Sequence, residues 1–313
     1  MRIFRNLSAF KEIKNPVITI GTFDGVHLGH QKIIAQINEE ARKIGGESVL
    51  FTFYPHPRMV LNPESHNLQL IHTQLEKLSR LEKLGLQNFI EVPFTIEFSK
   101  LSAFDFVAQI LVEKLHVKKL VIGYDHQFGK DREGTIEFLR GGSKTFDFEV
   151  IEISPLVIDD LNISSTKIRN AIKNGDMLKA NAYLGEPYSM CGTVIQGKQL
   201  GRILGFPTAN IEIKETYKLK PGRGVYAIEV SILEKKYFGM ANIGLRPTIN
   251  DGFGETIEVN IFDFSSDIYN ENLEVLFHHK IREEIKFENK EELINQLHQD
   301  EKTVRDFFNS FNN

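Results

Sequence analysis

Ten residues near the start of the chain constrain its fold more than any other stretch. They read Gly-Thr-Phe-Asp-Gly-Val-His-Leu-Gly-His over 21–30. An apolar, β-branched run over 16–20 precedes them and predicts a buried strand. Apolar residues then recur at helical spacing until Gly45-Gly46. The sequence therefore predicts a strand, a glycine turn and a helix, whose free N–H groups and positive helix end suit a phosphate.

The turn carries two histidines that could act on such a phosphate. His27 and His30 are three residues apart, so they share one face of the first helical turn. Gly29 adds no side chain between them, so a ligand can approach the backbone closely. Two imidazoles can stabilise the negative charge that builds on leaving oxygens. A lone His-x-x-His is more often a pair of surface histidines, but the glycine-rich turn favours function here.

Strand-like and helix-like segments alternate as far as about residue 184. We expect strands over 47–53, 88–92, 119–123 and 148–153, with helices between several of them. This alternation predicts a Rossmann-like α/β fold, in which a parallel sheet carries helices on both faces. Ligands then bind beyond the carboxyl ends of the strands, where residues 21–30 fall.

The character of the sequence changes near Gly185-Glu186-Pro187-Tyr188. Gly, Pro and Asn turns then separate short β-rich runs, with no helices expected between them, over 191–196, 208–213, 225–232, 237–243, 256–262 and 273–278. This pattern predicts a mainly antiparallel β-barrel, followed by a final helix at roughly 290–308. We expect two domains, 1–185 and 186–313, each long enough to bury a core.

Residues 21–30 resemble the HxGH signature of the nucleotidylyltransferases. The form GxFDGVHxGH is similar to that of the bacterial bifunctional riboflavin kinase/FMN adenylyltransferases, or FAD synthetases. The resemblance implies an N-terminal FMN adenylyltransferase domain and a C-terminal riboflavin kinase barrel. It also implies that His27 and His30 act in catalysis on ATP phosphates, and that the turn binds nucleotide through Gly21, Phe23, Asp24 and Gly25.

Two further loops of the first half resemble the same family. Residues 52–57 match TFxPHP and imply a binding role for His56, although a rigid proline loop is the simpler interpretation. Residues 123–134 resemble GxDFxFGxxRxG and imply a binding role for Asp125. His126 stands where the family usually has Phe, which weakens the expectation of aromatic packing against a ligand ring. A glycine-rich connector is the alternative for that loop.

Residues 163–169 open a helix with two hydroxyls and two cations. Ser164 or Ser165 can serve simply as the N-cap. Capping does not explain Lys167 and Arg169, because a helix start disfavours cations unless it holds an anion such as a polyphosphate. The match to the family's ISSTxIR implies that Ser164, Ser165 and Arg169 grip the ATP phosphates opposite the two histidines, with Arg169 catalytic.

The stretch of the second half with the most candidate binding residues runs from 192 to 210. Thr208 and Asn210 lie two residues apart on an expected strand, and their hard oxygens suit Mg²⁺ shared with ATP phosphates. The pair alone is weak evidence, and barrel glycines can equally mark bends. Residues 201–210 resemble the riboflavin kinase signature GRxLGFPTAN, which implies metal binding by Thr208 and Asn210. It also implies nucleotide binding by these two residues together with Gly192, Gly201, Arg202, Gly205 and Pro207.

Strand alternation places Glu258 and Asn260 on one face of the run 256–262, opposite three apolar residues. A solvated strand face is the default interpretation of such a glutamate. Its position matches the family's catalytic glutamate, which implies a general base for the ribityl hydroxyl of riboflavin.

Composition excludes several other classes of protein. Thirty-eight Lys and Arg against 42 Asp and Glu give a net charge of −4, without a basic footprint for nucleic acid or an anionic membrane. The single cysteine fits a reducing compartment, and no apolar leader or spanning run occurs. We expect a cytoplasmic monomer or weak homo-oligomer that acts on riboflavin, FMN and ATP with Mg²⁺.

These motifs favour a two-site enzyme that converts riboflavin to FMN and then FMN to FAD. A protein similar to the class I aminoacyl-tRNA synthetases would share the HxGH element. The short chain, the missing KMSKS-type loop and the lack of a basic face oppose that reading. A single-activity nucleotidylyltransferase with a non-catalytic, flavin-binding barrel remains a second alternative. Glu258, Thr208 and Asn210 together argue against it, because a binding module needs no base.

Overall fold

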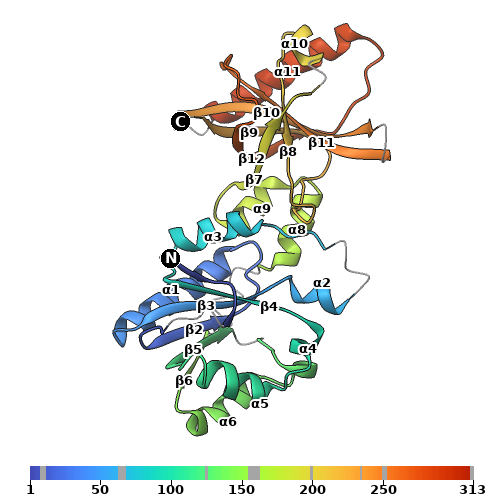
Figure 1. Ribbon diagram of the computed structural model, residues 1–313. Coiled ribbons are helices and arrows are strands. Elements are labelled where there is room, and N and C mark those ends of the chain that lie inside the picture. Colours follow the sequence, from blue (N-terminus) through green and yellow to red (C-terminus); the bar gives the residue numbers. More distant parts are fainter. Residues whose placement is uncertain are drawn as a thin grey trace. The chain divides into compact units, whose positions relative to one another are not determined.

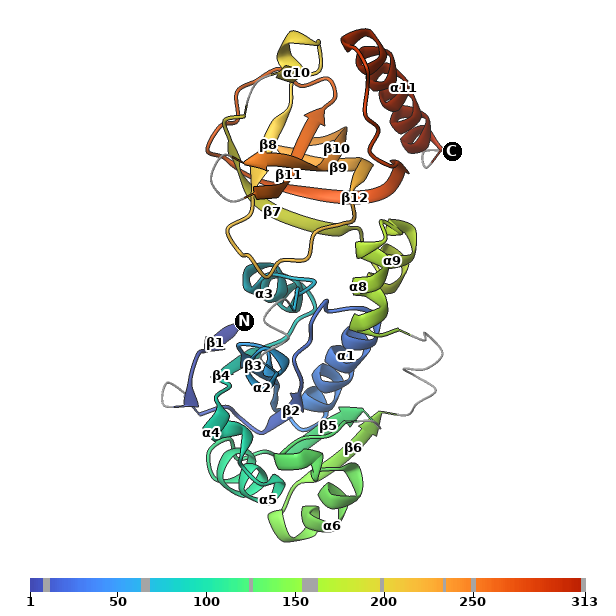
Figure 2. The same ribbon diagram turned by 90° about the vertical axis from the view of Figure 1, so that its right-hand side faces the viewer.

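The computed structural model describes residues 1–7, 12–62, 68–123, 126–153, 163–197, 200–232, 235–248 and 252–310. The chain divides into two compact units, Met1–Ser165 and Thr166–Asn313. The first unit contains a six-stranded sheet and the second a closed barrel. Figures 1 and 2 show the sheet and the barrel from two sides. This confirms the expected fold class.

The sheet of the first unit is parallel throughout and has the strand order β1-β4-β3-β2-β5-β6. Its strands are β1 (Arg2–Phe4), β2 (Pro16–Ile20), β3 (Glu47–Tyr54), β4 (Asn88–Pro93), β5 (Lys119–Gly123) and β6 (Glu149–Ile153). After β2 the chain adds β3 and β4 on one side and later returns to add β5 on the other. The order therefore reverses between β2 and β5, which is where ligands bind in sheets of this type.

Helices cover both faces of the sheet. Successive strand residues point to opposite sides, so each strand contributes side chains to both layers. Val17 packs with α1 (Leu28–Lys43) and α3 (Gln74–Lys83). Ile18 packs on the other face with a π-helical segment, Phe106–Val112, and with α6 (Ile136–Phe146). Shorter helices complete the unit: α2 (Pro57–Leu61), α4 (Ile96–Ser99) and α5 (Ala103–Asp105).

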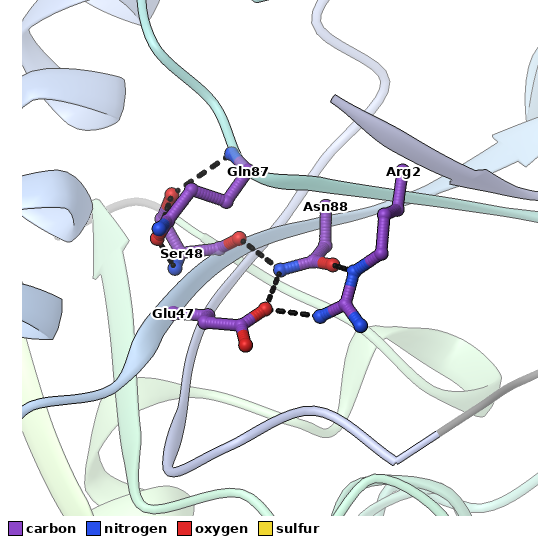
Figure 3. Close-up of polar contacts among 5 residues, drawn as sticks. All are labelled: Arg2, Glu47, Ser48, Gln87 and Asn88. Carbon is purple, nitrogen blue, oxygen red and sulfur yellow. Dashed lines mark hydrogen bonds and ion pairs between the residues drawn. The ribbon is translucent and has the colours of Figure 1, made fainter.

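A polar network fixes the amino-terminal ends of three neighbouring strands (Figure 3). The fully buried Asn88 donates from Nδ2 to Glu47 Oε2 at 3.0 Å and to the Ser48 carbonyl at 3.1 Å. Its Oδ1 accepts from Arg2 Nε at 2.8 Å, and Arg2 also pairs with Glu47. Gln87 Oε1 accepts the Ser48 N–H at 2.8 Å. Polar contacts thus fix the amino-terminal ends of these strands. We expect the ligand site at the opposite, carboxyl ends of the strands.

The second unit is a closed antiparallel barrel in the order β10-β11-β8-β7-β12-β9. Its strands are β7 (Tyr188–Ile195), β8 (Ala209–Glu212), β9 (Gly224–Ile232), β10 (Lys235–Thr248), β11 (Gly252–Ile261) and β12 (Asn272–Arg282). The C-terminal helix α11 (Lys290–Asn309) places Val304 and Phe308 in an apolar cluster with residues of β9 and β10. Arg282 of β12 binds the buried Asp300 of α11 with N–O distances of 2.7 to 3.0 Å.

Two helices precede the barrel, α8 (Ser165–Lys173) and α9 (Met177–Leu184). Asn181 of α9 donates from Nδ2 to the Phe277 carbonyl and accepts the Tyr188 N–H at Oδ1, both at 2.8 Å. The α9 helix is therefore bound to β12 and to the start of β7. The expected boundary between residues 185 and 186 stays a prediction.

One expectation for the barrel is wrong. No helix was expected between its strands, but α10 (Leu200–Ile203) lies between β7 and β8. The Phe206 N–H bonds to the Gly201 carbonyl at 2.8 Å, and Gly205 has a φ of +82° that ends the turn. A four-residue helix is too short to show helical periodicity in the sequence. No helix in the described ranges is long and apolar enough to cross a membrane.

Candidate active sites

The turn after β2 is held in a conformation that depends on its glycines. Phe23, Gly25 and Val26 all have positive φ, at +49°, +94° and +40°. A Cβ at Gly25 would lie 2.9 Å from Ile71 Cδ1, and one at Gly21 would lie 2.9 Å from the Phe23 ring. Non-glycine residues in the left-handed region cost about 1–3 kcal/mol each and concentrate at functional sites. The strained turn thus marks this end of the sheet as a candidate site.

The turn brings the two predicted histidines together. His27 is the N-cap of α1, and its Nδ1 accepts the His30 N–H at 3.4 Å. The His30 ring stacks on the His27 ring at 3.7 Å and on the Phe23 ring at 4.4 Å, centroid to centroid. A Cβ at Gly29 would lie 3.2 Å from the His27 ring. Phe23, His30 and His27 therefore form one aromatic stack, and Gly29 leaves it room.

Burial keeps both imidazoles neutral at pH 7. Desolvation lowers the pKa of His27 to about 4. The pKa of His30 lies well below its usual value, first because of burial and then because of His27 and Lys77. Since His27 Nδ1 accepts a hydrogen bond, the ring proton of this neutral histidine lies on Nε2. His27 can therefore donate one hydrogen bond to a ligand oxygen from Nε2.

Asp24 and Ser165 tie the turn to neighbouring segments. The buried Asp24 accepts the Ile71 N–H at Oδ1 at 2.9 Å, and its carbonyl accepts from Ser165 Oγ, also at 2.9 Å. Ser165 is the first residue of α8, so Ser164 holds the N-cap position. The contacts that the structure shows for Asp24 are anchoring contacts, and its expected role in nucleotide binding stays a prediction.

The other residues predicted for the first site belong to separate segments of the chain. His56 caps α2, where its Nδ1 accepts the Arg58 N–H at 3.2 Å. His126 stacks on Phe128 with a centroid distance of 6.0 Å. Arg169 belongs to the second unit, on α8. Asp125 lies outside the described residues.

The barrel brings together the predicted base and one of the predicted metal ligands. Glu258 of β11 pairs in register with Asn210 of β8 on one side and with Asn242 of β10 on the other. Directly opposed residues of antiparallel strands share a face, with Cβ atoms about 5 Å apart. Ile257 and Val259 point into the barrel and are 3% and 0% exposed, whereas Glu258 is half-buried. The alternation expected for this strand is thus confirmed.

The loop before β8 folds closely over this face. A Cβ at Gly197 would lie 2.1 Å from Asn210 Nδ2, and one at Gly201 would lie 2.2 Å from the Phe206 carbonyl oxygen and 3.3 Å from Thr208 Oγ1. The buried Asn260 donates from Nδ2 to the Pro207 carbonyl at 2.7 Å, which fixes the residue before Thr208. The glycines therefore leave room for the Thr208 and Asn210 side chains, and Asn260 fixes the residue before Thr208.

The remaining residues of the signature differ in their surroundings. A Cβ at Gly192 would lie 2.5 Å from the Glu212 carbonyl oxygen, so this glycine permits β7 to approach β8. Arg202 is exposed on α10. A surface hollow of about 300 Å³ lies elsewhere on the barrel, and no predicted site residue lines it; its walls are Lys235, Lys236, Tyr237, Phe238, Phe262, Asp263, Arg305, Phe308 and Asn309.

The donors fit a magnesium ion that is shared with a nucleotide. No group of three or more His, Cys, Asp and Glu residues that could hold a metal occurs in the part of the chain that the structure describes. Thr208 and Asn210 offer a hydroxyl and an amide oxygen, which are hard ligands. Mg²⁺ usually keeps several waters and takes one or two protein ligands together with substrate phosphates.

Sequence reasoning did not show the contacts of two residues at these sites, and it did not single out a third. Asn242 lies opposite Glu258 through strand pairing, and Asn260 donates a side-chain hydrogen bond to the Pro207 carbonyl. Lys77 contacts the first turn from α3. The helical pattern of that segment gave no sign of it, because periodicity does not show which residue of a distant segment a side chain contacts.

Comparison with known proteins finds a matching family model for each half of the chain. The FAD synthetase family model matches residues 9–167, and the riboflavin kinase model matches residues 184–308. A crystal structure described as a macrolide-efflux protein from Streptococcus pneumoniae is 35% identical, has a TM-score of 0.88 and covers 97% of this chain and 98% of its own.

Curated relatives named bifunctional riboflavin kinase/FMN adenylyltransferase match over nearly all or all of the chain. The protein of Haemophilus influenzae is 40% identical and covers 99% of this chain and 100% of its own. That of Buchnera aphidicola from Acyrthosiphon pisum is 37% identical with full coverage of both, and that of Escherichia coli is 36% identical over 93% and 92%. The chain therefore belongs to the bifunctional riboflavin kinase/FMN adenylyltransferase family.

Proposed function

We propose a division of the family's two activities within this chain and a role for each site residue. Residues 1–185 transfer the adenylyl group of ATP to FMN, and residues 186–313 phosphorylate riboflavin with ATP. The observation that carries this division is the alignment of Asn210 with Glu258 on one barrel face, remote in sequence from the histidine stack. Each half then has its own constellation of catalytic side chains.

In adenylylation, a phosphate oxygen of FMN attacks the α-phosphorus of ATP. A bond forms between them, the bond from the α-phosphorus to the bridging oxygen breaks, and pyrophosphate leaves. No protein nucleophile is needed, so the chain aligns the reactants and stabilises charge. We assign hydrogen-bond donation toward the phosphates to His27 Nε2 and to His30. Ser164, Ser165 and Arg169 complete the phosphate grip.

The turn itself contributes the rest of this nucleotide site. The N-terminus of α1 gives a positive helix end, and neutral imidazoles donate without carrying charge. Gly21, Phe23, Asp24 and Gly25 shape the turn, and we assign nucleotide-binding roles to His56 and Asp125 as well.

In the kinase reaction, Glu258 accepts the proton of the ribityl hydroxyl. The hydroxyl oxygen bonds to the γ-phosphorus of ATP, the bond to the β,γ-bridging oxygen breaks, and ADP leaves. Thr208 and Asn210 would hold Mg²⁺, which supplies charge neutralisation on the phosphates when bound. Gly192, Gly201, Arg202, Gly205 and Pro207 form the nucleotide-binding backbone and loop of this site.

We further propose a cytoplasmic monomer or weak homo-oligomer that uses no nucleic acid or membrane partner. The net charge of −4, with both signs spread along the chain, supports the part of this proposal that concerns nucleic acid and anionic membranes.

One experiment tests the function as a whole. The protein is incubated with riboflavin, ATP and Mg²⁺, and the flavins are separated by chromatography over time. FMN followed by FAD is the expected result. FAD formed only when FMN is supplied would favour a single-activity nucleotidylyltransferase with a non-catalytic barrel. No product from either flavin would contradict both readings.

A further inference from the structure

A buried lysine stands beside the histidine stack without a part in the mechanism above. Lys77, on α3, is 7% exposed. Its Nζ donates to the Thr22 carbonyl at 2.8 Å and to Thr52 Oγ1 at 3.4 Å, and it lies 5.4 Å from the centroid of the Phe89 ring. Burying an ammonium costs several kcal/mol unless partners compensate it. A neutral side chain would fill the same space without that cost.

The carbonyl that Lys77 binds belongs to the strained turn. Thr22 directly precedes Phe23, whose φ is +49° and whose ring stacks on His30. A hydrogen bond to the Thr22 carbonyl therefore fixes the peptide that sets the position of the Phe23 ring. Loss of that bond would release the turn at the residue where its left-handed conformation begins.

The helix that carries Lys77 is itself firmly held. Thr73 and Glu76 form a capping box, with hydrogen bonds of 2.8 and 3.3 Å between backbone N–H groups and side chains. The segment before the helix is tied to the turn by the bond from the Ile71 N–H to Asp24. Lys77 thus links the turn to a helix whose own position is fixed.

Lys77 also supplies charge where the imidazoles do not. The titratable groups that face it are Asp24 of the turn, Glu91 of β4, and His30 of α1. Burial lowers the pKa of Lys77 to about 8, while Glu91 and Asp24 act in the opposite direction. The ammonium is therefore charged at pH 7, beside two histidines that are neutral.

We propose that Lys77 is a positioning residue of FMN adenylylation: its ammonium holds the Thr22 carbonyl, and through Phe23 it keeps the histidine stack in the arrangement that receives the nucleotide phosphates. This inference rests on the proposed function of the first domain. Lys77 acts through the turn and is not assigned a contact with the substrate.

The test uses full-length Lys77→Met, with Lys83→Met as the matched control. Lys83 lies on the same helix and is exposed. FAD formation is measured from FMN and ATP, and FMN formation from riboflavin and ATP. We expect kcat for FAD formation to fall at least tenfold in Lys77→Met, while the KM for FMN and the rate of FMN formation change less than threefold. A kcat within twofold of the Lys83→Met value would overturn the proposal.

A pH profile separates positioning by a charged group from a packing role. In the wild type, kcat for FAD formation should fall as pH rises through about 8, where Lys77 loses its proton. Lys77→Met should lack this alkaline limb, and a limb that persists in it would contradict the proposal. If Lys77→Met does not fold, the wild-type profile decides, since a kcat that stays level up to pH 10 also contradicts it. Failure of the wild type to make FAD at pH 7 would instead overturn the proposed function.

Discussion

Asn210 of β8 and Glu258 of β11 are cross-strand partners on one face of the barrel. A carboxylate and an amide oxygen therefore meet at a point where two strands pair, and Asn242 of β10 extends the row on the far side of Glu258. Strand pairing fixes this arrangement more firmly than a loop would, because a slip of one residue would turn Glu258 toward the barrel interior.

The first prediction is that Glu258→Gln loses riboflavin kinase activity. The amide keeps the size of the side chain but cannot accept the hydroxyl proton, and a positioned base contributes roughly 10²- to 10⁴-fold. Riboflavin phosphorylation should fall within that range, while riboflavin affinity and FAD formation from FMN change little. Glu274→Gln, an exposed strand glutamate of β12, is the matched control. An unchanged kinase rate in Glu258→Gln would remove this residue from the mechanism.

The second prediction concerns His30→Ala, assayed for both activities. Loss of a donor that stabilises charge on transferring groups costs on the order of 10²- to 10³-fold in kcat. FAD formation should fall by that amount and FMN should accumulate, with the kinase rate as the internal control. His30 is a cleaner target than His27, because His27 also caps α1 and its removal costs about 1 kcal/mol of stability. Equal loss of both activities would indicate a folding defect instead.

Local features of the fold could be predicted from the sequence, whereas long-range contacts could not. The expected strand 16–20 and helix after the turn match β2 and α1, because both patterns are local. Within α3, Leu75 is 73% exposed while Lys77 is 7% exposed. The contact that buries Lys77 joins it to Thr22, 55 positions away, and helical periodicity carries no information about it. Tertiary contact overrides the local pattern there.

At the two candidate sites, too, motif residues could be predicted from the sequence but their mutual contacts could not. The sequence named His27, His30, Glu258 and Asn210 through motifs, and the alternation of β11 was readable from apolar residues alone. The register that opposes Glu258 to Asn210 depends on strand pairing, and the bond from Asn260 to Pro207 depends on the loop before β8. Neither relationship leaves a periodic signal along the chain.

The third prediction concerns stability at acid pH. The pKa of His27 is about 4 in the folded protein and 6.5 without the fold. Between these values the unfolded chain binds a proton that the folded one does not, so the free energy of unfolding rises with pH and falls on acidification. The full effect is about 3 kcal/mol. Urea unfolding at pH 7.5 and pH 4.5 measures it.

The matched variant for this measurement is His27→Asn. Asparagine is a good N-cap, so α1 should keep its start, but it does not titrate. The loss of stability between pH 7.5 and pH 4.5 should therefore be smaller in His27→Asn than in the wild type. An equal loss in both proteins would show that His27 does not carry the acid sensitivity.

The last prediction tests the proposed domain boundary with two fragments, 166–313 and 186–313. Both keep the barrel, α11 and the proposed metal ligands, so both should make FMN from riboflavin and ATP, and neither should make FAD. The shorter fragment lacks α9, whose Met177, Ala180 and Leu184 are buried and whose Asn181 bonds to Phe277 and Tyr188. Loss of these contacts should lower its free energy of unfolding by several kcal/mol relative to the longer fragment. Urea unfolding compares the two, and FMN formation is assayed on both fragments under the same conditions. A soluble 166–313 that forms no FMN would show that the kinase needs the first 165 residues, and FAD made by either fragment would overturn the division of activities.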